Sequence, residues 1–329
     1  MNLWEIYHPE MPSLLQDAAL TPPMRRLTGV GMNCGCEYTN FPFHRNCAPY
    51  SRFDHSVGVG LIVWHFTHDP TQAMSGLLHD IATPVFAHVI DFLHGDHMHQ
   101  ESTESATGQF IEQSALLGDV LARYGLSTEA VSDYHRYPIA DNDSPKLSAD
   151  RLEYTLGNGV NYGFISAEQA ANLYQDLTIG TNEFSEPELA FSHADDALSF
   201  AKLSLQCSKV YVSDEDRYAM QMLAELLKDA IDGSVLQECD LYRQERDLIK
   251  KLETSPYAAR WFEFRGYQKT IRKNTPGEIG AWRKIFAKKR CIDPLVNNYG
   301  RVTKLFPDYQ KEFTAFREES LDYWILGKS

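Results

Sequence analysis

Apolar residues recur at helical spacing wherever the sequence shows a readable pattern. Ser213 can cap a helix, an acidic turn follows it, and apolar positions then lie three or four residues apart until Gly233. The segment predicts a helix of about five turns over residues 213–232. Residues 57–64 and 110–121 carry similar spacing. Alternation of apolar and polar residues is scarce, so the sequence predicts an all-α fold.

The character of the chain changes near Gly233, from capped amphipathic segments to a region rich in aromatic and basic residues. We therefore expect a helical core over residues 1–232 and a mainly helical extension over residues 233–329. The aromatic residues of the extension favour a buried core, because large apolar side chains are the main source of burial energy. A surface that makes this mainly an interaction protein is the alternative. The residues concerned are Trp261, Phe264, Tyr267, Trp282 and Phe286.

Charge and hydropathy restrict the compartment and the partners. The chain starts without a basic and apolar leader, and its longest apolar stretch, residues 57–66, is too short to span a bilayer. A cytoplasmic protein without membrane association is therefore expected. A net charge of −14 disfavours nucleic acid as a partner. The stretch 266–290 is nevertheless basic, with Glu278 as its single acid. A solvated helix face is the favoured interpretation, and phosphate or partner binding is the alternative.

The cysteines are too few and too scattered for a disulfide framework, and they suit a reducing compartment. Cys34, Cys36, His44 and Cys47 nevertheless place four potential zinc ligands within one short stretch. The one-residue gap between the first two cysteines is tight for tetrahedral coordination, because zinc sites usually space such a pair by two to four residues. Buried free thiols are the favoured interpretation, and a zinc site is the alternative.

The strongest chemical signal comes from His55, His79, Asp80 and Asp150. Two imidazoles and two carboxylates suit one divalent ion, with Mn, Fe, Co, Ni, Zn or Mg as candidates, and they leave positions open for water and a phosphoryl oxygen. The chain has 12 histidines, and a single histidine in a helix is more often a packed core residue than a ligand. The four residues together are harder to explain in that way.

The order and context of these residues resemble the HD-domain phosphohydrolases, which are all-helical metal enzymes, and especially their deoxynucleoside triphosphate triphosphohydrolase branch. The resemblance covers residues 14–232. The segment TPPMRRL, beginning at Thr21, is similar to the family's early arginine-rich helix, and YSRFDHSVG, beginning at Tyr50, is similar to its first metal-ligand motif. The resemblance implies that the four residues above bind the metal and that the protein forms a homo-oligomer.

The resemblance also implies catalytic roles. The family's Phe-x-His-x-x-Asp pattern is present from Phe86 to Asp91 and includes His88, and a histidine that opens the next helix is matched by His99. His99 oriented by Asp91 is the implied acid or nucleophile-positioning pair, with His97 or His88 as substitutes. An imidazole can protonate a leaving oxygen near pH 7, and a neighbouring carboxylate holds its tautomer and raises its pKa.

Substrate contacts are implied for Arg52, Arg151 and Tyr154, which match positions that contact phosphates in the family. A planar guanidinium suits paired phosphate oxygens. Ion pairing within helices explains these residues equally well, so the sequence leaves both roles open.

The resemblance implies a metal-dependent hydrolase of phosphate esters or anhydrides that acts on a nucleotide. A triphosphohydrolase that releases triphosphate and nucleoside is the nearest case. One departure weakens it: the family has a histidine three residues after the aspartate of the His-Asp pair, where this chain has Thr83, and Ala82 replaces the intervening glycine. An HD-type 5'-nucleotidase, a phosphodiesterase and a catalytically inactive nucleotide-binding sensor are the alternatives.

Overall fold

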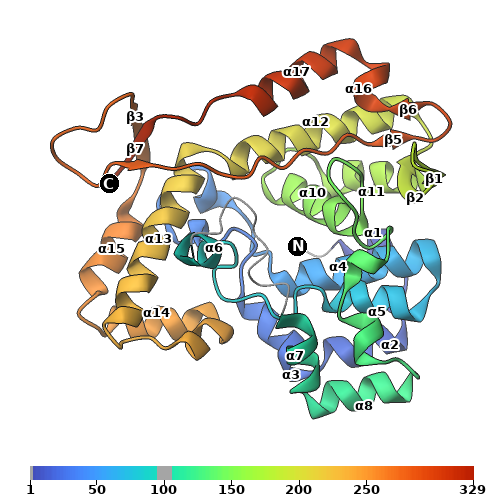
Figure 1. The fold of residues 1–329 in the computed structure, drawn as a ribbon, viewed down its shortest axis with the longest axis horizontal. Coiled ribbons are helices and arrows are strands. Elements are labelled where there is room, and N and C mark those ends of the chain that lie inside the picture. Colours follow the sequence, from blue (N-terminus) through green and yellow to red (C-terminus); the bar gives the residue numbers. More distant parts are fainter. Residues whose placement is uncertain (1–2, 95–105) are drawn as a thin grey trace.

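The computed structural model describes residues 3–94 and 106–329 and is built mainly from helices (Figure 1). The central helices are α4 (Arg52–Thr67), α5 (Pro70–Leu78), α10 (Ala149–Asn161), α12 (Ala194–Tyr211) and α13 (Asp214–Asp232). α4 packs against α5 and α10, and α12 packs against α10 and α13. Most side chains of α4 from Arg52 to Val63 are buried on all sides, so this helix forms the centre of the core.

The other helices surround this centre. In the first part of the chain they are α1 (Trp4–Tyr7), α2 (Ser13–Ala19), α3 (Pro22–Arg26), α6 (Val89–His94), α7 (Thr107–Glu112), α8 (Ala115–Arg123), α9 (Thr128–Val131) and α11 (Ala167–Gln175). After α13 they are α14 (Glu245–Glu253), α15 (Ala258–Gly266), α16 (Val302–Leu305) and α17 (Pro307–Glu318). Short 3-10 turns are η1 (Leu27–Gly29), η2 (Cys36–Tyr38), η3 (His44–Asn46), η5 (Tyr134–Arg136) and η6 (Glu238–Tyr242).

Two of the three helical predictions are confirmed as single helices, and the third divides. α13 begins directly after Ser213, whose side chain accepts a hydrogen bond from the backbone of Asp216, and it ends before Gly233. Residues 57–64 lie inside α4. Residues 110–121 instead span α7 and α8, because the Ser114 side chain accepts the backbone N–H of Leu117 and starts a new helix there.

The prediction of an all-α fold was too strict, because the structure contains two small sheets. The first has the order β1-β2-β5-β6 and the second the order β3-β7-β4. Their strands are β1 (Leu177–Thr181), β2 (Pro187–Phe191), β3 (Lys269–Lys273), β4 (Arg283–Lys284), β5 (Leu295–Val296), β6 (Gly300–Arg301) and β7 (Trp324–Lys328). β2 and β5 run parallel, and the other pairs are antiparallel.

The strands escaped the pattern analysis for physical reasons. Three of them are two residues long, which is too short for any period to appear. β2 is buried over its last four residues, so it shows no alternation of apolar and polar positions. β3 is exposed or half-buried throughout and reads as a polar run. The first sheet joins strands from both sides of Gly233, since β5 pairs with β2.

The basic stretch 266–290 is not a helix face, so that interpretation was wrong. After the last residue of α15, the stretch forms β3 and β4 and the loops around them (Figure 1). Its charges are partly neutralised: Arg272 pairs with Asp214 at the start of α13, and Nε of Arg283 lies 2.7 Å from Oε1 of Glu225.

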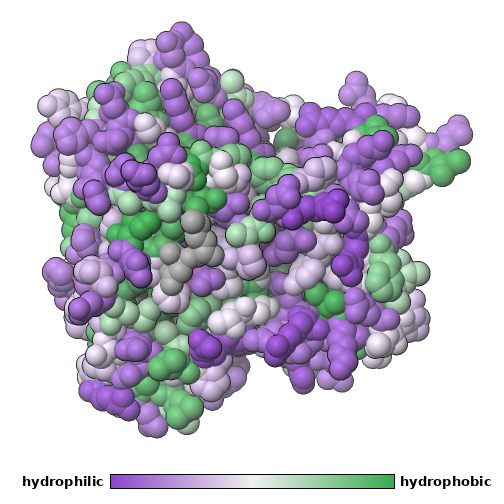
Figure 2. Space-filling model, turned by 180° about the vertical axis from the view of Figure 1, so that it is seen from behind, coloured by the Kyte–Doolittle hydropathy of each residue, from purple (hydrophilic) through white to green (hydrophobic). Residues whose placement is uncertain are grey.

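The core interpretation of the aromatic residues is confirmed for most of them. Trp261, Phe264, Tyr267 and Trp282 are buried, whereas Phe286 is 43% exposed. None of the helices in the described part of the chain is both long and apolar enough to cross a bilayer. On the face opposite to that of Figure 1, hydrophilic and hydrophobic residues are interspersed (Figure 2).

A buried ion pair joins two strands of the first sheet. Arg301, at the end of β6, donates to both carboxylate oxygens of Glu188 in β2, at 2.6 and 2.8 Å. Arg301 is 4% exposed and Glu188 is fully buried. Glu183 also accepts a hydrogen bond from Arg301, at 2.8 Å. Each buried charge is therefore compensated by its partner, because neither group is exposed enough for water to solvate it.

Replacing Arg301 by Ala should destabilise the protein by about 3–5 kcal/mol, because the buried carboxylate of Glu188 loses its counter-charge. Urea unfolding followed by circular dichroism measures this as a lower midpoint. Lys311→Ala is the control, since Lys311 and Asp308 form an exposed ion pair on α17. Equal midpoints for the two variants would contradict a stabilising role for the buried pair.

Candidate metal centre

The four predicted metal ligands lie at or near the ends of three helices. His55 lies in the first turns of α4, His79 and Asp80 directly follow α5, and Asp150 lies in the first turn of α10. Ser51 starts α4 by reciprocal hydrogen bonds with Asp54. Helix ends allow the adjacent residues His79 and Asp80 to turn toward one point, which the middle of a helix would not.

The ligand atoms of these residues converge. Nε2 of His55 lies 3.0 Å from Oδ1 of Asp150, 3.2 Å from Nε2 of His79 and 3.8 Å from Oδ2 of Asp80. Nε2 of His79 lies 3.6 Å from the same Asp80 oxygen and 3.7 Å from the same Asp150 oxygen. Ligand atoms about 2.0–2.2 Å from one tetrahedral ion lie about 3.3–3.6 Å apart. One ligand atom each of His55, His79 and Asp80 lies within 4.8 Å of the other two, and Asp150 lies beside both imidazoles, so a small contraction would let these residues hold a metal.

The opposite ring nitrogens fix how the two imidazoles face each other. Nδ1 of His55 lies 2.6 Å from Oε2 of Glu153, and Nδ1 of His79 lies 2.7 Å from the carbonyl oxygen of Gly76. Both partners only accept hydrogen bonds, so both Nδ1 atoms carry protons and the Nε2 atoms point at each other. Two nitrogen lone pairs 3.2 Å apart require a proton or a metal cation between or beside them.

The pKa values of the predicted ligands are consistent with a positive charge between the two imidazoles and the two carboxylates. Burial lowers the pKa of His55, but hydrogen bonds to Asp150 and Glu153 outweigh it and raise the pKa to about 10. Burial raises the pKa of Asp80, and the charges of Arg52, His79 and His55 lower it further than burial raises it. Asp150 is likewise held ionised, chiefly by His55 against the effect of burial. Without a metal, a proton supplies the positive charge.

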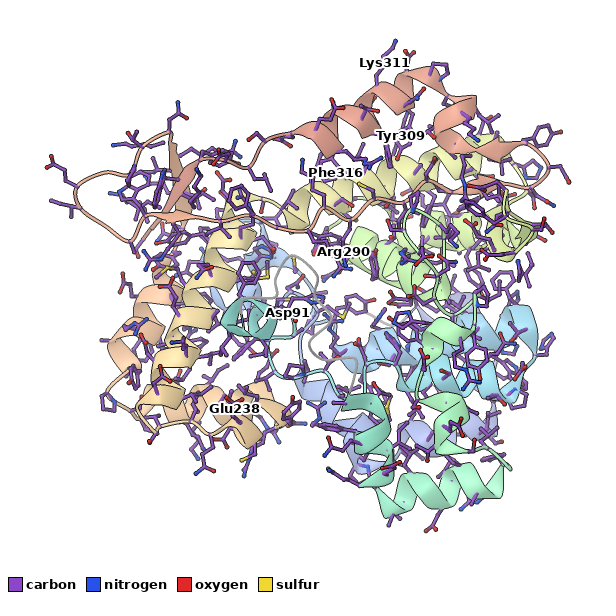
Figure 3. All side chains as sticks on the ribbon, viewed as in Figure 1. Asp91, Glu238, Arg290, Tyr309, Lys311 and Phe316 are labelled. Carbon is purple, nitrogen blue, oxygen red and sulfur yellow. The ribbon has the colours of Figure 1, made fainter. Side chains whose placement is uncertain are left out.

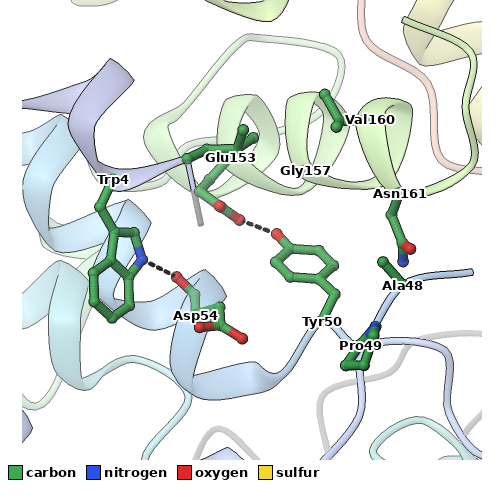
Figure 4. Close-up of a pocket in the computed structure, with 10 residues that line it drawn as sticks. Trp4, Ala48, Pro49, Tyr50, Asp54, Glu153, Gly157, Val160 and Asn161 are labelled. Carbon is green, nitrogen blue, oxygen red and sulfur yellow. Dashed lines mark hydrogen bonds between the residues drawn. The ribbon is translucent and has the colours of Figure 1, made fainter. Parts of the chain in front are cut away.

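Glu153 was missed as a site residue in the sequence, although it lies one helical turn after Asp150 on α10. Its Oε2 accepts a hydrogen bond from the Tyr50 hydroxyl (Figure 4). Oε2 also accepts from His55, and Oε1 accepts from Tyr7 at 3.3 Å. The side chain is 2% exposed. A carboxylate behind a ligand histidine is the usual device that fixes its orientation and raises its basicity.

Two glycines make room for this support. A Cβ added at Gly58 on α4 would lie 2.6 Å from Cγ of Glu153, and one at Gly157 on α10 would lie 2.3 Å from the Tyr50 hydroxyl. The small cavity of about 10 Å³ between these groups is far too small for a substrate (Figure 4). The glycines therefore allow α4, α10 and Tyr50 to close tightly around Glu153.

Thr83 and Arg52 position Asp80. The Thr83 hydroxyl donates to Oδ1 of Asp80 at 2.6 Å, and Nη1 of Arg52 donates to Oδ2 at 3.0 Å. Thr83, which stands where the family has a histidine, thus holds Oδ1 of Asp80, whereas Oδ2 is the oxygen that approaches the two imidazoles. Arg52 makes an ion pair, as its alternative role implied, and it also lines the large cavity, where it could meet a phosphate.

A cavity of about 910 Å³ opens beside the predicted ligands. Its cationic lining residues are Arg52, Arg151, Arg290, Lys146, Lys288 and Lys289. Its tyrosines are Tyr134, Tyr154, Tyr162 and Tyr211. It also has acidic residues, namely Asp80, Asp141, Asp143, Asp150, Glu186 and Asp216. The cavity thus combines the predicted metal ligands, positive charge and aromatic surface.

The predicted substrate residues Arg151 and Tyr154 line this cavity. Nη1 of Arg151 lies 2.9 Å from Oδ1 of Asn142 and 3.0 Å from Oδ1 of Asp141, so the guanidinium already has partners. The Tyr154 ring lies 5.8 Å from the guanidinium carbon of Arg290. Both residues can reach a molecule in the cavity, and their predicted contact with phosphates stays a prediction.

Asp91 contacts His88, which lies three residues before it. Nδ1 of His88 lies 2.9 Å from Oδ2 of Asp91, and Nη2 of Arg290 donates to Nε2 of His88 at 3.1 Å. A guanidinium only donates, so Nε2 accepts and Nδ1 carries the proton. Burial and the charges of Arg290 and Arg52 lower the pKa of His88, against the hydrogen bond to Asp91. His97 and His99 lie outside the described residues, so the His99–Asp91 pair stays a prediction.

Arg290 is the second site residue that the sequence did not identify. It comes from the C-terminal basic stretch and lies near the middle of the molecule, close to α6, which carries Asp91 (Figure 3). The neighbouring Lys289 also lines the cavity, but its Nζ donates to the carbonyl oxygens of Phe316 and Glu319, both at 2.5 Å, at the end of α17. The run of similar charges in the sequence gave no signal that Arg290 would contact His88.

Comparison with known proteins found relatives in sequence and in fold. No family model matches the chain. It is 24% identical over 243 residues to the uncharacterised protein YdhJ of Bacillus subtilis, covering 74% of this chain and 71% of that protein. It is 25% identical over 213 residues to the metal-dependent phosphohydrolase cns2 of Cordyceps militaris, covering 64% of this chain and 58% of that protein. The chain therefore spans less than two thirds of the fungal relative.

Among solved structures, a phosphohydrolase of Bacteroides thetaiotaomicron matches with a TM-score of 0.65 and 14% identity. The match covers 97% of this chain and 96% of that one, so the two share a fold over nearly their whole length. One relative in sequence and one in fold are thus named phosphohydrolases. They do not distinguish the triphosphohydrolase branch from the others.

Replacing Glu153 by Gln should lower the metal affinity by about 10- to 100-fold, because His55 loses the carboxylate that fixes and polarises its ring. Competition with a fluorescent chelator measures the affinity for Mn²⁺ or Co²⁺. Glu168→Gln on α11 is the matched control, since that side chain is exposed. Unchanged metal affinity in Glu153→Gln would show that the Glu153 carboxylate does not support the metal site.

Proposed function

We propose that this protein is a metal-dependent hydrolase of phosphate esters or anhydrides and that its substrate is a nucleotide. The observation that carries the proposal is the convergence of the Nε2 atoms of His55 and His79 with oxygens of Asp80 and Asp150 on the wall of a large cationic cavity. A bound divalent ion would lower the pKa of a water and polarise a phosphoryl oxygen.

The chain's own residues would then bind and orient the phosphate. Arg52 is fixed by Asp80, and Arg151 by Asp141, so both guanidinium groups are held at the cavity before a ligand arrives. Groups that are already oriented cost little reorganisation when negative charge develops on the phosphate oxygens. Arg290, from the segment after β4, adds a third guanidinium to the cavity wall.

His88 would be able to supply a proton only after a change at Arg290. In the present arrangement its Nε2 accepts a hydrogen bond and carries no proton to give. A phosphate that attracts Arg290 would free this nitrogen, and Asp91 would then stabilise the protonated ring. His99 remains the first candidate for the acid by resemblance, with His88 as its substitute.

A nucleotide fits the cavity better than a small phosphate does. The volume of about 910 Å³ falls within the range of sites that enclose drug-sized ligands. Tyr154 and Tyr211 present rings with their centroids 6.3 Å apart, and rings of this kind can contact a base. The triphosphohydrolase reaction is the first one that we propose to test, by family resemblance.

Thr83 supports an alternative function. Its hydroxyl is committed to Asp80, and a hydroxyl cannot take the place of an imidazole in proton transfer near neutral pH. A nucleotidase or phosphodiesterase would depend less on a proton-transfer group at position 83, and a nucleotide sensor would not need one. The reaction products decide among these functions.

Metal-free protein should regain activity when Mn²⁺ is added, and the test is a panel of nucleoside mono-, di- and triphosphates and cyclic esters with chromatography of the products. Triphosphate released with a nucleoside would establish the triphosphohydrolase. Inorganic phosphate from monophosphates, or an opened cyclic ester, would establish one of its relatives. Asp150→Ala should abolish metal binding and turnover together. Full activity in that variant would overturn the metal assignment, and nucleotide binding without turnover in the unchanged protein would indicate a sensor.

Replacing Arg290 by Ala should lower kcat/KM by about 10- to 100-fold, because a charge-assisted hydrogen bond to a phosphate is worth about 1.5–3 kcal/mol. The kcat/KM of Arg290→Lys should lie between those of the unchanged protein and Arg290→Ala, since a lysine keeps the charge without the planar guanidinium. Arg246→Ala on α14 is the control, with a guanidinium that is 81% exposed. Steady-state kinetics on the best substrate of the panel would contradict the role if Arg290→Ala matched the control.

A further inference from the structure

A second group of metal-ligand side chains lies apart from the predicted metal centre. It consists of Cys36 in η2, His44 in η3 and Asp216 in the first turn of α13. Sγ of Cys36 lies 3.4 Å from Oδ1 of Asp216, and Nε2 of His44 lies 3.9 Å from the same oxygen. One ligand atom of each residue lies within 4.8 Å of the other two. Residues far apart in the sequence thus bring sulfur, nitrogen and oxygen to one point.

His44 is buried, at 3% exposure, and its Nδ1 has no hydrogen-bond partner within the described residues. Nε2 faces the group, at 3.9 Å from Oδ1 of Asp216, which is too long for a hydrogen bond. An ion at Nε2 would not pair Nδ1, but it would bridge the gap between Nε2 and Asp216.

The spacing fits a tetrahedral zinc site. Bonds of about 2.3 Å to sulfur and about 2.0 Å to nitrogen and oxygen place ligand atoms about 3.3–3.6 Å apart. The separation of 3.4 Å between Cys36 and Asp216 lies in this range, and the separation of 3.9 Å between His44 and Asp216 exceeds it, so His44 would move toward the other two ligands when an ion binds. We propose that Cys36, His44 and Asp216 bind a second divalent ion of borderline softness, such as Zn²⁺.

This set differs from the four zinc ligands that the sequence suggested. Sγ of Cys34 faces the carbonyl oxygen of Met32 at 3.9 Å, and Sγ of Cys47 faces that of Phe43 at 3.6 Å. Only Cys36 and His44 of that stretch join the group, which removes the strain of ligating two cysteines one residue apart. Asp216 replaces them, from 180 residues further along the chain.

The proposed ion would tie the loop before α4 to α13. This loop carries Cys36 and His44 and is closed by a β-bridge between Gly31 and Ser51, directly before the helix that bears His55. Asp216 also lines the large cavity, so the proposed ion would lie close to the cavity wall. A role in holding one wall of the cavity follows from this position.

Cobalt substitution tests the site independently of catalysis. His55, His79, Asp80 and Asp150 contain no sulfur, so a thiolate-to-cobalt charge-transfer band in the near ultraviolet can come only from a cysteine-containing site. The full-length protein loaded with Co²⁺ should show this band, and plasma mass spectrometry of the protein as purified should find more than one metal ion per chain. Absence of the band in the unchanged, folded protein would overturn the proposal.

Variants assign the ligands. Cys36→Ser should abolish the band and remove one ion while the ion at the first centre stays, and Asp216→Asn, which has almost the same shape, should weaken binding of the second ion at least tenfold. Cys47→Ser is the matched control and should keep the band. Persistence of the band in Cys36→Ser, or its loss in Cys47→Ser, would overturn the assignment. If Cys36→Ser fails to fold, Asp216→Asn decides: unchanged affinity for the second ion would reject the site.

Discussion

Two imidazoles that face each other at 3.2 Å are the constraint on which the rest of the site depends. Each ring is turned by its Nδ1 atom, one toward the carboxylate of Glu153 and the other toward the backbone of Gly76. The two Nε2 atoms therefore meet where Asp80 and Asp150 also bring negative charge. Such an arrangement is stable only with a cation, which is why the chemistry of the cavity follows from helix packing around α4.

The support of the first imidazole extends across the core. Glu153 would be costly at 2% exposure without partners, and Tyr7, Tyr50 and His55 all supply hydrogen bonds to it. These partners come from α1, from the segment before α4 and from α4 itself. Tyr7 and Tyr50 thus contribute both buried aromatic surface and hydrogen bonds to Glu153. The stability of the core and the orientation of His55, a predicted ligand, are therefore coupled.

The cavity is composite, since residues from both ends of the chain line it. The predicted ligands lie on α4, directly after α5 and on α10, whereas Arg290 comes from the segment after β4. Lys289 binds the carbonyl oxygens at the end of α17, and its neighbour is thereby directed inward to His88. The metal centre and the groups that would recognise a substrate therefore come from different parts of the sequence.

The sequence by itself determined the helices with strong local signals, such as α13 with its cap at Ser213, and the set His55, His79, Asp80 and Asp150. Capping and helical spacing act between near neighbours, and residue types define a donor set. Only the tertiary structure decided that Glu153 orients His55 and that Arg290 faces the cavity. It also decided the short strands and the meeting of Cys36 with Asp216. These depend on contacts between distant segments, which leave no period or spacing in the sequence.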